Sequence, residues 1–197
     1  GSAFLLHQKL DPSTRSELLN ELFSTTGSGI GISYLRLSIG ASDLDDHVFS
    51  YDDLPPGETD LALDKFTIDE DRKHLIPVLK EILAINPELR IMGSPWSAPA
   101  WMKTTDSLVG GRLKDDPAIY DAYARYLVKF VQAYAASGVP VDYLSLQNEP
   151  QNRVPDAYPG TDMPVARASS TMRRIFSPQP GAWRPSRAPW CSTNPRT

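Results

Sequence analysis

The sequence is poor in the residues that build disulfide frameworks and metal clusters. Cys191 is the only cysteine, which excludes an internal disulfide and a thiolate metal cluster. The three histidines, His7, His47 and His74, lie far apart in the sequence, and the acidic residues show no metal-ligand spacing. We therefore predict no metal ion and no other cofactor.

The sequence also lacks a long apolar run. No window approaches the roughly 18 uninterrupted apolar residues that a membrane-spanning helix needs, so we predict no stable membrane insertion. The opening residues, Gly-Ser-Ala-Phe-Leu-Leu-His, carry no basic region and do not read as a signal peptide. A signal peptide could lie upstream, so these residues leave the cellular location open.

Acidic residues are absent from the last part of the chain. All 24 aspartates and glutamates lie at or before Asp162, whereas residues 166–197 contain six arginines, no lysine and many serines and prolines. A basic tail of this kind is one sign of nucleic-acid binding. The change in composition predicts a folded domain over residues 1–165 and a separate tail over residues 166–197.

Three segments of the domain carry helix signals. An Asp-Pro pair, which supplies a cap and a first helical residue, stands at Asp11 and again at Asp116. Thr67 precedes Glu70 by three residues, the spacing of a capping box. Apolar residues at helical intervals follow each start, and we expect Pro77 to kink the second helix.

Each predicted helix is followed by a short apolar run with strand character, at residues 32–38, 89–93 and 141–146. Helices that alternate with strands in this way predict parallel strands joined by helical crossovers. Both a doubly wound sheet and a (β/α)8 barrel satisfy the pattern. No Gly-x-Gly-x-x-Gly turn follows a strand, which disfavours dinucleotide binding.

The polar and aromatic residues gather in the loops after the three strands, at residues 39–66, 94–115 and 147–165. Such loops at the carboxyl ends of parallel strands form the working face of a barrel. Glu149 ends the third run, and Pro150 prevents the ladder from continuing. We predict that Glu149 is a general acid, kept protonated in an aromatic-lined pocket, and that Asn148 donates to a substrate hydroxyl. The alternative is an ordinary exposed glutamate.

The second loop contains Trp96 and Trp101 within a proline-rich stretch, a stiff aromatic surface against which the C–H faces of a sugar can pack. Alternatively both indoles only cover the barrel end; we expect one of them to do so and favour Trp96 for the ligand. Asp43 follows the first strand and is predicted to accept hydrogen bonds from sugar hydroxyls, although a turn aspartate is the common alternative. Arg36, inside that strand, is expected to pair with a carboxylate.

Four segments follow one another in this order: Tyr-Leu-Arg-Leu-Ser-Ile-Gly-Ala-Ser-Asp, Ser-Pro-Trp-Ser-Ala-Pro-Ala-Trp-Met-Lys, Tyr-Ala-Arg-Tyr-Leu-Val-Lys-Phe and Leu-Gln-Asn-Glu-Pro. Together they resemble glycoside hydrolase family 30, the family of the glucosylceramidases (acid β-glucosidases). The resemblance implies an α/β fold, a (β/α)8 TIM barrel of which residues 1–165 supply about strands 2–4 with their helices. It implies a retaining hydrolase of β-glucosidic bonds by double displacement. Glu149 then matches the acid/base, and Asn148, Asp43 and Trp96 match residues that hold the sugar.

The family nucleophile is a second glutamate at the end of the seventh strand, and this sequence has no acid after Asp162. We therefore expect the chain to be inactive alone. We interpret residues 166–197 as disordered or read out of frame. Because the basic tail is then not a genuine part of the fold, this interpretation argues against nucleic-acid binding. The expected partner is a carbohydrate or glycolipid substrate, with no specific protein partner. The sequence favours a glucosylceramidase-like activity; a β-1,6-glucanase, a xylanase or a non-catalytic carbohydrate-binding fragment are the alternatives. A secreted or periplasmic location is expected if a signal peptide lies upstream.

Overall fold

The computed structural model describes residues 1–152 and 157–164, together with Ser169 and Arg173. Within this part the elements follow one another as α1 (Ser2–Lys9), α2 (Pro12–Phe23), β1 (Tyr34–Ile39), α3 (Asp69–Lys73), α4 (Leu75–Ile85), β2 (Arg90–Pro95), the 3-10 turn η1 (Ala100–Met102), α5 (Pro117–Ala136) and β3 (Tyr143–Leu144). None of the described helices is long and apolar enough to cross a membrane. Apart from those two positions, the tail predicted for residues 166–197 lies outside the described residues.

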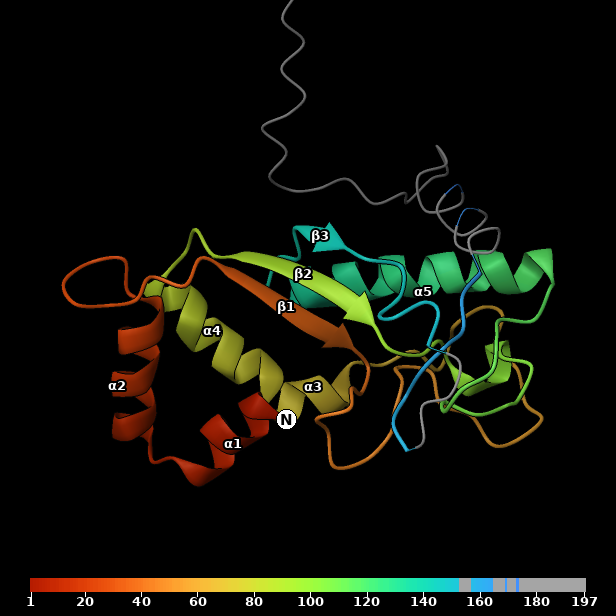
Figure 1. The fold of residues 1–197 in the computed structure, drawn as a ribbon, viewed down its shortest axis with the longest axis horizontal. Coiled ribbons are helices and arrows are strands. Elements are labelled where there is room, and N and C mark those ends of the chain that lie inside the picture. The colour runs from red at the N-terminus through yellow and green to blue at the C-terminus, as the bar shows by residue number, and fades with distance from the viewer. Residues whose placement is uncertain (153–156, 165–168, 170–172, 174–197) are drawn as a thin grey trace, which may run out of the picture.

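The three strands form one parallel sheet in the order β1-β2-β3, joined by helical crossovers (Figure 1). This confirms the parallel arrangement predicted from the sequence. β3 is shorter than the predicted 141–146, but the ladder continues on both sides of it. The N–H groups of Asp142 and Ser145 donate to the carbonyl oxygens of Ile91 and Gly93 on β2, at 2.8 and 2.9 Å.

Both Asp-Pro pairs begin helices, as predicted. The side chain of Asp11 accepts hydrogen bonds from the backbone N–H groups two and three residues further on, at 3.0 and 3.1 Å. The side chain of Asp116 accepts from the N–H two residues further on, at 2.8 Å. Each aspartate therefore satisfies N–H groups that the first turn of a helix leaves without a partner.

The second predicted helix is two helices, α3 and α4, separated by His74 with φ −139° and ψ −48°. Pro77 accounts for the break, because its ring clashes with the carbonyl group four residues earlier, on Lys73. The predicted kink is therefore a full interruption. It turns α4 so that its apolar side, which includes Leu79 and Ile82, is buried.

The predicted capping box at the start of α3 is wrong. The hydroxyl of Thr67 accepts from the N–H of Asp69 at 3.2 Å, two residues on, whereas the motif requires the N–H of Glu70, three residues on. The N–H of Thr67 is already bound to the carbonyl oxygen of Tyr51 at 2.8 Å, so it cannot serve Glu70. Glu70 instead forms an ion pair with Lys73 at 2.6 Å. A tertiary contact has taken the donor that the motif requires.

The core lies between one face of the sheet and the helices. Alternate residues of β1 separate the two faces, because Leu37 and Ile39 are buried whereas Arg36 is exposed on the opposite face. Gly93 on β2 allows α5 to approach closely, since a Cβ atom there would lie 2.8 Å from the ring of Phe130.

The loop after β1 is fixed to α5 through buried hydroxyl groups. Tyr51 of the loop and Tyr134 of α5 both donate to one carboxylate oxygen of Asp71, and the N–H of Tyr51 donates to the hydroxyl of Tyr126 at 3.2 Å. Burial raises the pKa of Asp71 to about 6. The loop that carries Asp43 is therefore attached to α3 and α5 at Tyr51, further along the chain.

Candidate active site

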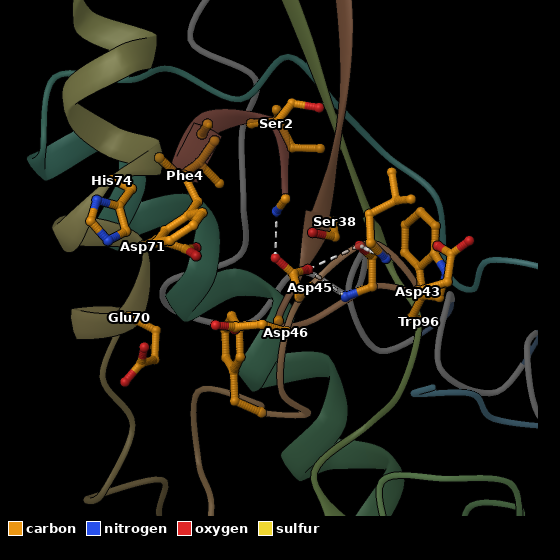
Figure 2. A pocket seen from close by; sticks show the side chains of 18 of the residues that line it. Ser2, Phe4, Ser38, Asp43, Asp45, Asp46, Glu70, Asp71, His74 and Trp96 are labelled. Carbon is orange, nitrogen blue, oxygen red and sulfur yellow. Dashed lines mark hydrogen bonds and ion pairs between the residues drawn. The ribbon is translucent and has the colours of Figure 1, made fainter. Parts of the chain in front are cut away.

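A cavity of about 390 Å³ lies between the carboxyl end of β1 with its following loop, the first residues of α1 and the junction of α3 and α4, and Trp96, just after β2, also lines it. Its lining includes Asp43 and Trp96, two of the predicted sugar-binding residues, together with Arg36 and Ser38 of β1. Figure 2 shows Asp43 beside Trp96 at one end of this pocket. The volume lies within the roughly 300–1,000 Å³ of typical small-molecule sites. The pocket therefore includes part of the predicted working face, at the end of β1, while α1 and the α3–α4 junction supply much of its remaining lining.

Arg36 connects three parts of this face. Its Nη2 atom donates to Ser94 Oγ of β2 at 2.9 Å and to Asn148 Oδ1 at 2.6 Å. Its guanidinium carbon lies 4.7 Å from the centre of the Trp96 ring, a cation–π contact. The predicted carboxylate partner is wrong within the described residues, because the arginine is exposed and neutral oxygens and an indole surround its charge.

The contact with Arg36 fixes the orientation of the Asn148 amide. A guanidinium can only donate hydrogen bonds, so the oxygen of the amide must face it. The Nδ2 group of Asn148 is therefore turned away from Arg36 and can donate to a ligand. The backbone N–H of Asn148 donates to the carbonyl oxygen of Pro95 at 2.7 Å, which holds this residue beside the end of β2.

The carboxylate of Asp43 is exposed at the pocket, and no hydrogen bond to it is formed within the described residues. The turn role considered as its alternative belongs to Asp45. The carboxylate of Asp45 accepts from the N–H and the hydroxyl of Ser42 at 2.8 and 2.9 Å. Asp43 is thus left with its acceptor oxygens available to a ligand.

Glu149 follows Asn148 with its backbone in the left-handed region, at φ 45°. This conformation costs a non-glycine residue roughly 1–2 kcal/mol. The side chain of Asn152 supports the carboxylate, since its Nδ2 donates to Glu149 Oε2 at 3.0 Å and to the hydroxyl of Tyr158 at 2.9 Å. Glu149 is exposed and does not line the pocket. The predicted aromatic enclosure of its carboxyl is therefore not formed by the described residues.

The sequence matches the model of the glycosyl hydrolase family 30 TIM-barrel domain over residues 2–166. The chain belongs to glycosyl hydrolase family 30. It is 38% identical over 155 residues to an endo-1,6-β-D-glucanase of Trichoderma harzianum, covering 73% of this chain and 31% of that protein. It is 33% identical over 155 residues to the lysosomal acid glucosylceramidase of Mus musculus, covering 76% of this chain and 29% of that protein.

Among solved structures, the endo-β-1,6-glucanase BT3312 resembles this family 30 chain with a TM-score of 0.76 and 32% identity, covering 87% of this chain and 37% of that one. SrfJ from Salmonella typhimurium resembles it with a TM-score of 0.74 and 26% identity, covering 86% and 36%. The three parallel strands are an incomplete portion of a TIM barrel, as predicted. The chain spans about a third of the length of these relatives.

Trp101 does not join the site of the family 30 chain. It is 1% exposed, and its indole N–H donates to Asp52 Oδ2 at 3.0 Å. Burial raises the pKa of Asp52 to about 6. We therefore correct the assignment of Trp101 as a sugar-binding residue: within the described structure it is a buried core residue, and Trp96 is the tryptophan at the pocket.

Gln147 is a site residue that the sequence analysis missed. Its Nε2 donates to the carbonyl oxygens of Trp96 at 2.6 Å and of Asn148 at 2.9 Å. Its Oε1 atom is buried and has no partner within the described residues. Gln147 thus ties the loop of Trp96 to the segment that carries Glu149. Its position in Leu-Gln-Asn-Glu-Pro was the one available signal.

Among the residues that the structure describes, no group of three or more His, Cys, Asp or Glu side chains is arranged to hold a metal ion.

Proposed function

We propose that this chain supplies the acid/base half of a retaining β-glucoside hydrolase, with Glu149 as the residue that protonates the departing oxygen. The observation that carries the proposal is the position of Arg36, which contacts both Asn148, the neighbour of Glu149, and Trp96 at the pocket. Membership of a glycoside hydrolase family supports the same chemistry.

In this proposal each side chain has one task. Trp96 packs against the C–H face of the sugar, Asp43 accepts hydrogen bonds from its hydroxyls, and the oriented amide of Asn148 donates to a hydroxyl beside the scissile bond. Glu149 protonates the leaving oxygen and later removes a proton from water, as in double displacement.

The partner carboxylate is not assigned to this chain. Retention requires a nucleophile roughly 5–5.5 Å from the acid/base, and no aspartate or glutamate follows Asp162. We propose that the chain alone binds a β-glucoside without hydrolysing it. Hydrolysis then needs the part of the barrel that the relatives carry beyond the matched region.

The substrate favoured by the relatives is β-1,6-glucan. The 38% identity to the fungal enzyme and the structural similarity to BT3312 both point to proteins named as endo-1,6-β-glucanases. The 33% identity to the acid glucosylceramidase keeps glucosylceramide, the substrate class favoured by the sequence analysis, as the second candidate.

The test is a chimera in which residues 2–164 replace the matching part of the Trichoderma harzianum enzyme. We expect the chimera to hydrolyse β-1,6-glucan with retention, measured by the anomer first released. Glu149→Gln should lower this activity by about 10²–10⁴-fold, the usual contribution of a general acid. It should spare the first step on aryl glucosides with good leaving groups, because these need little protonation.

Glu88→Gln is the matched control, since Glu88 is an exposed glutamate just before β2, at the opposite end of the sheet. It should leave both substrates unaffected. Equal losses on β-1,6-glucan and on the activated glucoside in Glu149→Gln would argue against this residue as the acid. Sugar binding by a chimera that never hydrolyses would favour the carbohydrate-binding alternative.

A further inference from the structure

Lys103, just after η1, is a fully buried lysine, with 0% of its surface exposed. Lysines are almost never buried in this way unless their charge has partners. Its Nζ atom donates to three oxygens: Ser97 Oγ at 2.8 Å, the carbonyl of Leu108 at 2.9 Å and the carbonyl of Gly160 at 2.7 Å. These three bonds use all three N–H donors of an ammonium group.

The three acceptors are neutral; Ser97 and Leu108 lie in the same loop as Lys103, whereas Gly160 lies 57 residues further along the chain. Burial lowers the pKa of Lys103 to about 7, whereas the acceptors favour the charged form that donates to them. The hydroxyl of Ser97 donates its one proton to the carbonyl oxygen of Ala98 at 2.8 Å, so towards Lys103 it acts as an acceptor. The bonding pattern therefore suits an ammonium group that joins the loop after β2 to the segment around Gly160.

The first joined segment leads to the sugar pocket. Ser97 directly follows Trp96, and the N–H of Ala98 donates to Thr161 Oγ1 at 3.2 Å. Through Lys103 and Thr161, the loop that carries Trp96 is attached to the segment around Gly160. Trp96 has a further anchor on the other side, since its carbonyl oxygen accepts from Gln147.

The second joined segment leads to the proposed acid. Tyr158, two residues before Gly160, accepts a hydrogen bond from Asn152 at 2.9 Å, and the same Nδ2 group of Asn152 donates to Glu149 at 3.0 Å. One ammonium group thus lies between two routes: through Ser97 to Trp96, and through the segment 158–160 and Asn152 to Glu149.

We propose that Lys103 is a positioning residue that fixes the sugar-binding indole of Trp96 and the carboxylate of Glu149 relative to each other. It does so by tying the loop after β2 to the segment after β3 through its three hydrogen bonds. The expected effect of Lys103 on sugar binding rests on the function proposed above. Its expected effect on the positions of Trp96 and Glu149 does not.

The test compares Lys103→Met with the control Lys114→Met in the full chain. Methionine keeps the length of the side chain and removes its donors. Lys114 lies in the same loop and makes one bond, to the carbonyl of Trp101 at 2.7 Å, so its replacement removes an equal charge without touching Ser97 or Gly160.

The readouts are the NMR signals of the Trp96 indole N–H and the Asn152 side-chain amide, assigned with Trp96→Phe and Asn152→Ala. We expect Lys103→Met to shift or broaden both signals and Lys114→Met to leave both unchanged. A lysine that only stabilises the fold would lower the melting temperature of Lys103→Met and leave both signals in place while the chain is folded. That result would overturn the proposal. If the methionine variant does not fold, Lys103→Gln, which keeps two donors on a shorter side chain, must move the same signals.

The second arm measures binding of gentiobiose, the β-1,6-linked glucose disaccharide, by calorimetry. Misplacement of positioning groups is costly, and we expect Lys103→Met to weaken binding by about tenfold or more. Unchanged affinity despite altered signals would overturn the positioning role at the sugar. Absence of binding to the unaltered chain would count against the proposed function, while the two NMR signals still decide the role of Lys103.

Discussion

Replacing Arg36 by methionine should both destabilise the chain and weaken its binding of a sugar. The change removes hydrogen bonds to Asn148 and Ser94 and the contact over Trp96. Each hydrogen bond contributes about 0.5–1.5 kcal/mol, and an exposed cation–π contact about 0.5–1 kcal/mol. Because Arg36 is exposed, the lower values apply, and we expect a loss of about 1–2 kcal/mol.

For a chain of this size, that loss corresponds to a melting temperature lower by about 2–8 °C. The effect on binding is separate, because Asn148 becomes free to rotate its amide. The loss of one oriented donor should weaken gentiobiose binding by roughly fivefold, which corresponds to about 1 kcal/mol. Arg36→Lys should lie between, since an ammonium can keep one bond but cannot stack flat on the indole.

Thermal unfolding followed by circular dichroism gives the first quantity, and calorimetric titration with gentiobiose gives the second. Arg72→Met is the control, because Arg72 is an exposed arginine of α3 whose ion pair with Asp69 is also exposed. Such pairs contribute little, so this variant should match the unaltered chain. If Arg36→Met and Arg72→Met cannot be distinguished in either assay, the contacts of Arg36 do not organise the site.

Three other perturbations test the core and the pocket. Gly93→Ala should cost about 1–3 kcal/mol of unfolding free energy in urea, since the new methyl group would collide with Phe130; equal stability would contradict the close approach of α5. The raised pKa of Asp71 means that, between about pH 4 and 6, the folded chain holds a proton that the unfolded chain has released, so through this group stability falls as pH rises in that window. Asp71→Asn should remove this part of the pH dependence, and an unchanged profile would refute it. Trp101→Phe should lower the stability of the fold and leave gentiobiose binding unchanged, whereas Trp96→Ala should weaken gentiobiose binding and leave the stability unchanged. If Trp101→Phe weakened binding and Trp96→Ala lowered stability, the two roles would have to be exchanged.

The parts of the fold that follow local rules could be predicted from the sequence. The helix starts at Asp11 and Asp116 depend only on contacts within one turn. The order of helices and strands was enough to predict a parallel sheet. The capping box at Thr67 failed because its donor is used by Tyr51, a residue of a distant loop.

The candidate site was predicted less completely, because its geometry depends on how strands and loops align. Nothing in the sequence could say that Arg36 lies across from Asn148, or that Glu149 adopts a left-handed backbone. Trp96 and Trp101 share one loop and similar neighbours, and only burial separates them. Lys103 next to that apolar stretch was a signal that the sequence analysis did not use.

The amide beside Glu149 also has a consequence for which ligand groups can bind next to it. If the amide of Asn148 were flipped, its N–H groups would face the N–H groups of Arg36. The side chain can therefore present only its N–H donors to a ligand. A ring oxygen or a hydroxyl oxygen can accept a hydrogen bond there. A protonated amino group would face the N–H donors of Asn148 and the guanidinium of Arg36 and would find no acceptor, so we expect an amino sugar with its charge at this position to bind poorly.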